Sequence, residues 1–266
     1  SELDPLEWSD GKQRVFFGAK EQVQELDSVG GETNGGANVD VWNTIDQRIQ
    51  SVQMRRADTD RNFTFRQAFD VRTGRFVELT GESMRHLDVA PAGHWAVGRD
   101  TRGFIHDFNP AAADIYRVDT STGERTLMLS NHLTGSGLLG FSADGRYYLY
   151  WKDEKIHAYD LEAGTARVLG GESAPSFLDV EYDQAGPKPS YGLAGFTTDG
   201  AAAVARARYD LWVLPLDGSP AWNLTHGQGA RDEIRFRHVD LEPDEGPTER
   251  GRSRGGPMEI DLSKPL

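Results

Sequence analysis

Hydrophobic and polar positions alternate most clearly between residues 141 and 171. Four of the five side chains from Tyr147 to Trp151 are aromatic, and the positions from Lys155 to Leu161 and from Thr165 to Leu169 continue the strand-like pattern. Asp-Gly at 144–145 and Ala-Gly at 163–164 are turn signals, because glycine readily takes the positive φ of tight turns. With Gly137 to Phe141 as a first strand, the stretch predicts a four-stranded antiparallel meander.

The same pattern recurs along the chain. Turns that end in glycine and lead into a β run occur at Gly11, Gly93, Gly145 and Gly200. A second set of glycine turns, each before a closing strand, occurs at Gly74, Gly123, Gly164 and Gly218. Four-stranded units repeated every ~40–50 residues are typical of a β-propeller. The sequence therefore predicts an all-β fold, a β-propeller with four recognisable blades and the start of another. Phe141, Tyr148, Trp151, Tyr159 and Leu161 are expected to pack between its sheets.

The repeats set the boundaries of the units. They fall at about 5–81, 87–131, 137–171 and 191–226, with the start of a next unit at 234–241. The first unit is the longest because it carries an insertion, in which residues 39–42 and 49–54 have β character and residues 55–61 predict a charged loop. Residues 242–259 are charged and low in complexity, which predicts disorder, and residues 260–266 would begin a further strand.

Both ends of this repeat pattern are incomplete, which favours a partial ring. A propeller closes by pairing its first and last strands, so an open arc leaves sheet edges and apolar blade faces in water. We expect an isolated arc of this kind to aggregate or to bind a partner.

Composition narrows the classes of partner. The formal net charge is −13, which argues against nucleic acid and anionic membranes, although simple solubility also explains it. The chain has no cysteine, so disulfides and thiolate metal sites are excluded. No apolar run approaches the ~18 residues of a membrane span.

Catalytic motifs are missing from the sequence. Gly171 to Pro175 resembles the nucleophile elbow of hydrolases but lacks its final glycine. The seven histidines are scattered without the spacing of a zinc site, and lone histidines in β units are more often surface or turn residues. Asp58 to Asn62 begins like a calcium loop but has Phe63 where the turn glycine belongs. We therefore expect no catalytic residue, no metal and no cofactor in this chain.

Five residues are candidates for substrate binding. They are Trp42, Asp46, Arg48, Arg235 and Arg237. The first three lie in the insertion of an otherwise compact repeat, and loops on rigid scaffolds commonly carry recognition. The two later arginines alternate with apolar residues and would share one strand face. The alternative interpretation is a structural tryptophan with a local Asp–Arg pair, and arginines that only face solvent.

Several segments resemble the propeller of the prolyl oligopeptidase family of serine peptidases, in particular its bacterial dipeptidyl-peptidase-like and acylaminoacyl-peptidase-like members. The most specific is residues 39–50, VDVWNTIDQRIQ, and the resemblance covers nearly the whole chain. Weaker matches are residues 114–119, 122–125, 209–213, 223–225 and 234–237. The family also has an α/β-hydrolase domain with the catalytic Ser, Asp and His, and no part of it is visible in this sequence.

The resemblance implies a non-catalytic propeller that gates and recognises peptide substrates for a hydrolase domain of the same parent chain. It favours a periplasmic or secreted location, which composition does not reveal. Asp-Gly and Thr-Gly repeats also occur in TolB-like propellers, so a periplasmic protein-binding scaffold is the alternative. A glycan-active propeller that uses loop carboxylates is a third possibility. Because the hydrolase is absent, the chain alone is expected to be inactive.

Overall fold

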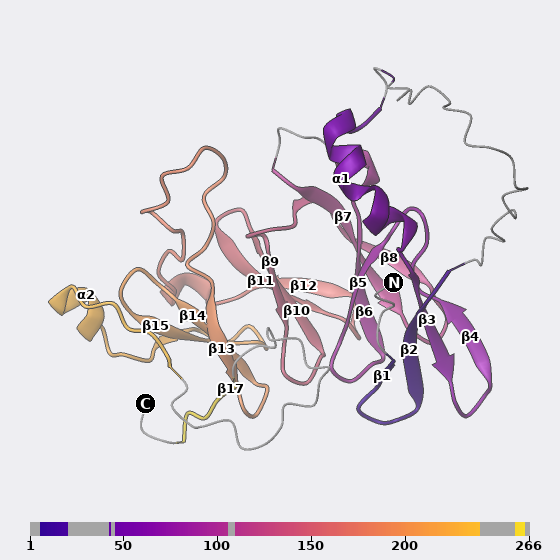
Figure 1. Ribbon diagram of the computed structural model, residues 1–266. Coiled ribbons are helices and arrows are strands. Elements are labelled where there is room, and N and C mark those ends of the chain that lie inside the picture. Colours follow the sequence, from indigo (N-terminus) through magenta and orange to yellow (C-terminus); the bar gives the residue numbers. More distant parts are fainter. Residues whose placement is uncertain (1–5, 21–42, 44–45, 106–109, 240–258, 264–266) are drawn as a thin grey trace, which may run out of the picture.

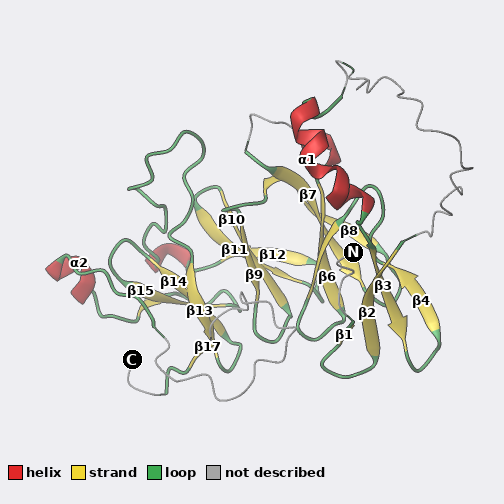
Figure 2. Ribbon diagram, in the orientation of Figure 1, coloured by secondary structure: helices red, strands yellow, loops and turns green. Residues whose placement is uncertain are grey.

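Four β-sheets follow one another across the molecule (Figure 1). The computed structural model describes residues 6–20, 43, 46–105, 110–239 and 259–263. Strands dominate the fold, and the helices lie outside the sheets (Figure 2). No strand of the first sheet pairs with a strand of the fourth in the described part of the chain. The prediction of an all-β fold built from four-stranded blades is confirmed.

Each blade is an antiparallel meander in which strands pair in chain order. The first blade contains β1 (Glu7–Trp8), β2 (Arg14–Ala19), β3 (Phe65–Asp70) and β4 (Arg75–Glu78). The second contains β5 (His86–Val89), β6 (Trp95–Asp100), β7 (Ala112–Asp119) and β8 (Arg125–Leu133). The third contains β9 (Leu138–Phe141), β10 (Tyr147–Lys152), β11 (Lys155–Asp160) and β12 (Thr165–Val168). The fourth contains β13 (Leu193–Thr197), β14 (Ala202–Arg206), β15 (Leu211–Pro215) and β16 (Trp222–Asn223).

The core lies between adjacent blades because alternate residues of each strand point to opposite faces. Tyr148, Tyr159 and Leu161 of the third blade pack against the second blade, and Phe141 contacts the same cluster. Trp151 lies on the other face and packs towards the fourth blade. The five residues expected between sheets are therefore found there.

The insertion in the first blade contains a helix where the sequence pattern predicted β character and a charged loop. Helix α1 (Gln50–Arg61) covers most of residues 49–54 and all of 55–61, so both interpretations are wrong. Residues 49–54 pair with no described strand, and Gln, Met, Arg and Ala have good helix propensity. Met54 remains exposed, so the helix adds little to the core. Residues 39–42 lie outside the described residues.

The strand expected at 234–241 is absent over residues 234–239, the part that the structure describes. Phe236 instead donates its backbone N–H at 2.8 Å to Tyr209 O, in the connection between β14 and β15. The strand β17 (Glu259–Ile260) adds to the fourth sheet, parallel to β13. Of residues 242–259, expected to be disordered, 242–258 lie outside the described residues, and Glu259 belongs to β17.

The short helices mark the remaining connections. These are η1 (Arg102–Phe104), η2 (Gly171–Ser173) and α2 (Gln228–Asp232). The first follows β6, the second follows β12, and α2 follows β16. All three short helices therefore lie in connections outside the sheets.

Candidate functional site

The two ends of the blades carry different connections. At one end, a short turn joins the first and second strands of each blade, and another joins the third and fourth (lower side of Figure 1). Gly145 shows why these turns use glycine: its φ is +71°, and an added Cβ would lie 3.0 Å from Pro91 Cδ of the neighbouring blade. These turns leave little room for a binding loop.

The opposite end carries the longer connections, and we call it the long-connection end. Its longest segments are residues 20–64, 101–111 and 169–192. The turn at Asp153 and Glu154 is the one tight two-residue hairpin there within the described chain. Helix α1 lies at this end (Figure 1). Rigid sheets that present loops on one side are a common arrangement for recognition.

Asp46 and Arg48 lie together at the start of α1. The Asp46 carboxylate accepts hydrogen bonds from the Asn43 backbone N–H at 3.1 Å and from Gln53 Nε2 at 3.4 Å. Gln53 Nε2 also donates to Arg48 O at 2.8 Å. No ion pair joins Asp46 to Arg48 among the described residues, and Trp42 lies outside them. The carboxylate therefore shapes this turn while remaining exposed.

Helix α1 is held against the connection between the first two blades. Arg85 Nη1 forms an ion pair with Asp60 of the helix at 3.2 Å. The Arg85 guanidinium also lies 5.0 Å from the ring centroid of Phe63. Lys20 Nζ donates to Arg61 O at 3.1 Å, so both ends of the insertion are tied together.

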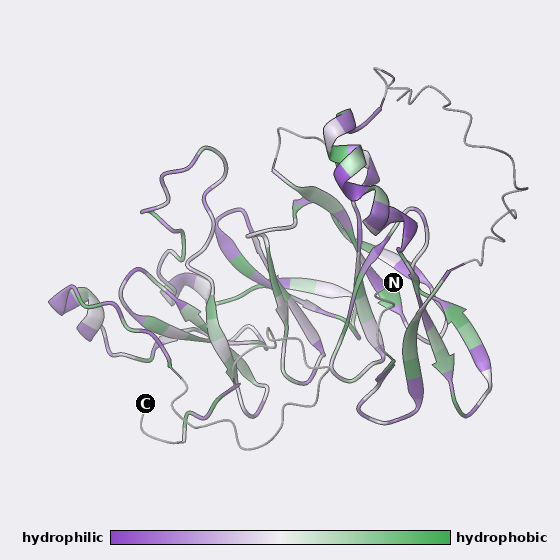
Figure 3. Cartoon of the chain, in the orientation of Figure 1, coloured by the Kyte–Doolittle hydropathy of each residue, from purple (hydrophilic) through white to green (hydrophobic). Residues whose placement is uncertain are grey.

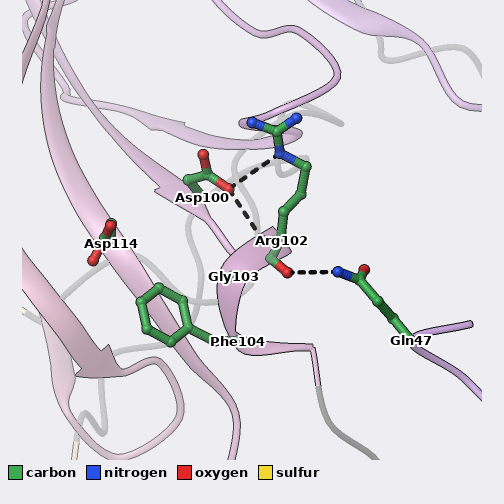
Figure 4. A pocket seen from close by; sticks show the side chains of 6 residues that line it. All are labelled: Gln47, Asp100, Arg102, Gly103, Phe104 and Asp114. Atoms are coloured by element: carbon green, nitrogen blue, oxygen red, sulfur yellow. Dashed lines mark hydrogen bonds and ion pairs between the residues drawn. The ribbon is translucent and has the colours of Figure 1, made fainter. Parts of the chain in front are cut away.

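A shallow hollow of about 490 Å³ lies between the insertion and the second blade (Figure 4). It is lined by Gln47, Asp100, Arg102, Gly103, Phe104 and Asp114. Gln47 Nε2 donates to Arg102 O at 3.2 Å, which bridges the two blades. Asp100 accepts the Arg102 backbone N–H at 3.1 Å. Sequence reasoning missed this hollow because its lining comes from distant segments, and only Gln47 neighbours a predicted residue.

Arg235 and Arg237 lie beyond the fourth blade, and the structure separates their roles. Arg235 Nη2 forms an ion pair with Glu181, and Arg208 Nε lies 3.4 Å from the same carboxylate. The hydrogen bond from Arg235 lowers the pKa of Glu181, so the carboxylate stays charged. Arg237 is exposed and has no ion pair to a described residue. The expectation of a shared strand face is wrong, because this segment forms no strand.

The insertion residues and the late arginines come from opposite ends of the row of blades. No hydrogen bond or ion pair joins Asp46 or Arg48 to Arg235 or Arg237 within the described ranges. The structure therefore brings together Asp46, Arg48 and the hollow, and leaves Arg237 as a separate cation at the margin of the fourth blade.

His132 is held by contacts with neighbouring strands. His132 is buried, contrary to the expectation of a surface or turn residue, and burial lowers its pKa. Its Nε2 lies 3.1 Å from Gly137 O, and its ring contacts Tyr150 edge to face at 5.7 Å. These contacts join β8 to the residues around β9 and β10, so the imidazole has a structural role.

Across the described ranges, no group of three or more His, Cys, Asp or Glu side chains could hold a metal ion. Within those ranges, no helix is long and apolar enough to cross a membrane.

Neither a protein-family model nor a curated protein matches the sequence. Solved structures with a similar arrangement include TolB from Acinetobacter baumannii, with 14% identity, a TM-score of 0.37, and coverage of 84% of this chain and 43% of TolB. Putative TolB from Agrobacterium tumefaciens has 13% identity and a TM-score of 0.38, with coverage of 84% of this chain and 61% of that protein. The tricorn protease has 15% identity and a TM-score of 0.40, with coverage of 80% of this chain and 18% of the protease. The chain thus spans less than two thirds of each of these proteins, and at such identity the likeness concerns the fold alone. By its own blades, the chain is a β-propeller scaffold.

Proposed function

We propose that this propeller scaffold recognises peptide segments at its long-connection end and carries no catalytic chemistry of its own. The supporting observation is the contrast between the two ends of the blades: tight glycine turns on one side, and α1, η1 and the 169–192 connector on the other. In a serine exopeptidase or oligopeptidase, this end would face the α/β-hydrolase domain and restrict entry to short peptides. That assignment also draws on the family resemblance of residues 39–50.

The polar groups at this end suit the two termini of a peptide. Arg48 lies near the hollow and is the cation placed to attract a carboxylate, whereas Arg237 is an exposed cation that lies apart, beyond the fourth blade. Asp114 lines the hollow and would favour an amine, whereas Asp100 is already paired with Arg102 Nε at 3.6 Å. Arg235 is less suited to substrate binding, because Glu181 already occupies its guanidinium.

The second candidate is a TolB-like scaffold that binds a folded protein in the periplasm. The shallowness of the hollow favours a protein-binding scaffold. A broad, shallow surface suits a folded protein partner, whereas the end of a peptide is better held in an enclosed pocket. The coding sequence after Leu266 separates the two candidates. A segment with G-x-S-x-G followed by Asp and then His supports the peptidase, and an early stop codon supports the binding scaffold.

Peptide titration tests the proposed site. Short fluorescent peptides with free termini are titrated into the chain and into the variants Arg48→Glu and Arg237→Glu. Arg48→Glu should weaken binding by up to about fivefold, since an exposed charge pair contributes roughly 0.2–1 kcal/mol, and Arg237→Glu should have a smaller effect because it lies farther from the hollow. Arg72→Glu makes the same charge change in a tight turn at the opposite end and should leave affinity unchanged.

Equal effects at all three positions would indicate attraction by overall charge and would contradict a site at the long-connection end. The chain alone should also fail to hydrolyse aminoacyl or dipeptidyl reporter amides. Turnover that survives repurification and is lost in Asp46→Ala or Arg48→Ala would overturn the claim that the chemistry lies elsewhere.

A further inference from the structure

Three interfaces between adjacent blades use the same two faces. We call the face that packs on the following blade the forward face, and the face that packs on the preceding blade the rear face. Phe16 on the forward face of the first blade packs with Ala96 and Val118 on the rear face of the second. The second and third blades, and the third and fourth, meet in the same order. Forward faces always meet rear faces in these three interfaces.

Strand register identifies equivalent rear-face positions in all four blades. The cross-strand pairs at this position are Val15 with Phe69, Ala96 with Val118, Tyr148 with Tyr159, and Ala203 with Leu214. The last six residues are buried, because a preceding blade covers them. Val15 and Phe69 of the first blade are only half-buried.

The turn between the third and fourth strands shows a larger difference. Thr120, Leu161 and Leu216 occupy equivalent positions in the second, third and fourth blades and are 0%, 0% and 1% exposed. Val71 occupies this position in the first blade and is 48% exposed. Val71 is therefore an exposed apolar residue at a position that is covered in the second, third and fourth blades, which indicates a contact surface.

Each covered turn also receives an arginine from the preceding blade. Arg14 Nη1 donates to Thr120 Oγ1 at 2.8 Å. Arg117 Nη1 donates to Leu161 O at 2.9 Å, and Arg167 Nη1 donates to the turn carbonyl of the fourth blade at 2.6 Å. Within the described chain, no arginine donates to the Val71 carbonyl. The three acceptors differ, being the Thr120 hydroxyl and the carbonyls of Leu161 and Asp217, so what the first blade lacks, among the residues described, is an arginine from a preceding blade at this turn.

Aromatic side chains extend this face of the first blade. Trp8 is 56% exposed and Phe76 is 68% exposed. The Phe76 ring lies 4.7 Å from the Phe69 ring and 6.1 Å from the Phe17 ring, measured between centroids. Figure 3 shows hydrophobic segments on the strands of this blade at one end of the molecule. A cluster of exposed aromatics marks a contact surface more often than isolated apolar residues do.

The fourth blade shows the opposite situation. Its forward face, which has no following blade in the described chain, is covered by Leu224, Phe236, Ile260 and Leu262. The chain therefore covers its last forward face with its own residues and leaves its first rear face exposed. The two ends of the arc are not equivalent.

We propose that the rear face of the first blade is a docking surface for a further four-stranded antiparallel sheet of blade type. The sheet would present aliphatic side chains to Val15, Phe69 and Phe76, and an arginine to the turn at Val71. A second copy that used the same face is a poorer occupant, because rear faces never meet each other in the three interfaces seen. The forward face of a second copy's fourth blade is already covered.

Site-specific photo-crosslinking tests this inference in the full-length product of the gene, expressed in its own host. A benzophenone amino acid replaces Val71, and the control replaces Val168, which is also valine and 43% exposed but lies on the outer strand of the third blade. Mass spectrometry then identifies the crosslinked peptide. We expect a several-fold higher yield at position 71, with adducts on a strand of a four-stranded sheet. Replacing the arginine nearest the adduct with methionine should lower that yield.

Equal yields at positions 71 and 168 would show that the face is open to solvent and would overturn the inference. Adducts with the first blade of a second copy would indicate a symmetric dimer, and adducts with a helical segment or a lipid would indicate another occupant. Each of these results also contradicts the proposal. Because the face lies away from the peptide site, none of them bears on peptide binding.

Discussion

Replacing Phe196 with alanine is expected to destabilise the chain by about 3–5 kcal/mol, the usual cost of removing a buried phenylalanine ring. Phe196 is fully buried between the third and fourth blades, where it packs in one cluster with Leu149, Trp151 and Leu214. The cavity would loosen the contact that positions the fourth blade. Thermal unfolding followed by circular dichroism should show a midpoint lower by roughly 10 °C.

Phe76→Ala is the matched control, because the same ring is removed from a side chain that is 68% exposed. Its cost should stay below about 1 kcal/mol. Equal destabilisation by the two variants would show that the blade interface is not the main source of stability, and would contradict the packing described for the third and fourth blades.

Replacing Asp210 with alanine should cost about 2–4 kcal/mol, since hydrogen bonds to a charged group contribute roughly 1.5–3 kcal/mol each and are not additive. The buried carboxylate accepts hydrogen bonds from Thr225 Oγ1 at 2.6 Å, from Gly229 N at 2.9 Å and from Ala230 N at 3.2 Å. These bonds hold α2 and the segment that leads to Arg237. Urea unfolding measures the loss.

The same carboxylate gives a pH dependence. Burial alone would raise the pKa of Asp210, but the three hydrogen bonds outweigh burial and lower it. A lowered folded-state pKa means that this stabilisation is complete above the unfolded value of about 3.9 and is lost as pH falls through the folded value. Asp210→Ala should remove this acid-dependent part, whereas Asp183→Ala, at an exposed position of the connector, should leave it intact. An unchanged acid profile in Asp210→Ala would contradict the assignment.

The blades could be predicted because local signals determine them. Aromatic runs such as Tyr147 to Trp151, followed by glycine turns such as Gly145 and Gly164, fix strand and turn within a few residues of each other. Alternation then assigns each side chain to a face, which is why Tyr148 and Trp151 were expected between sheets.

Helix α1 was missed because short alternations do not distinguish a strand from a helix. Ile49, Val52 and Met54 can be read with either period. What decides the outcome is tertiary: the segment pairs with no described strand, and the Arg85–Asp60 ion pair holds it as a helix. The segment after Ile234 was misread for the same reason.

The candidate site was predicted only in part, since its residues meet through folding. Asp46 and Arg48 do lie at the long-connection end, but Asp100, Arg102 and Asp114 of the hollow gave no sequence signal. The pairing of Arg235 with Glu181 joins residues more than fifty positions apart. Nothing in the local pattern around either residue indicates that contact.

Hydrogen–deuterium exchange, measured with and without a saturating short peptide, tests the central claim most directly. The account predicts slower exchange at the long-connection end, in residues 46–61 and 101–105, and unchanged exchange in the tight turns at 90–94, 142–146 and 161–164. Protection confined to those tight turns, or no protection anywhere when the peptide is bound, would contradict a peptide-recognition scaffold that works through its long connections.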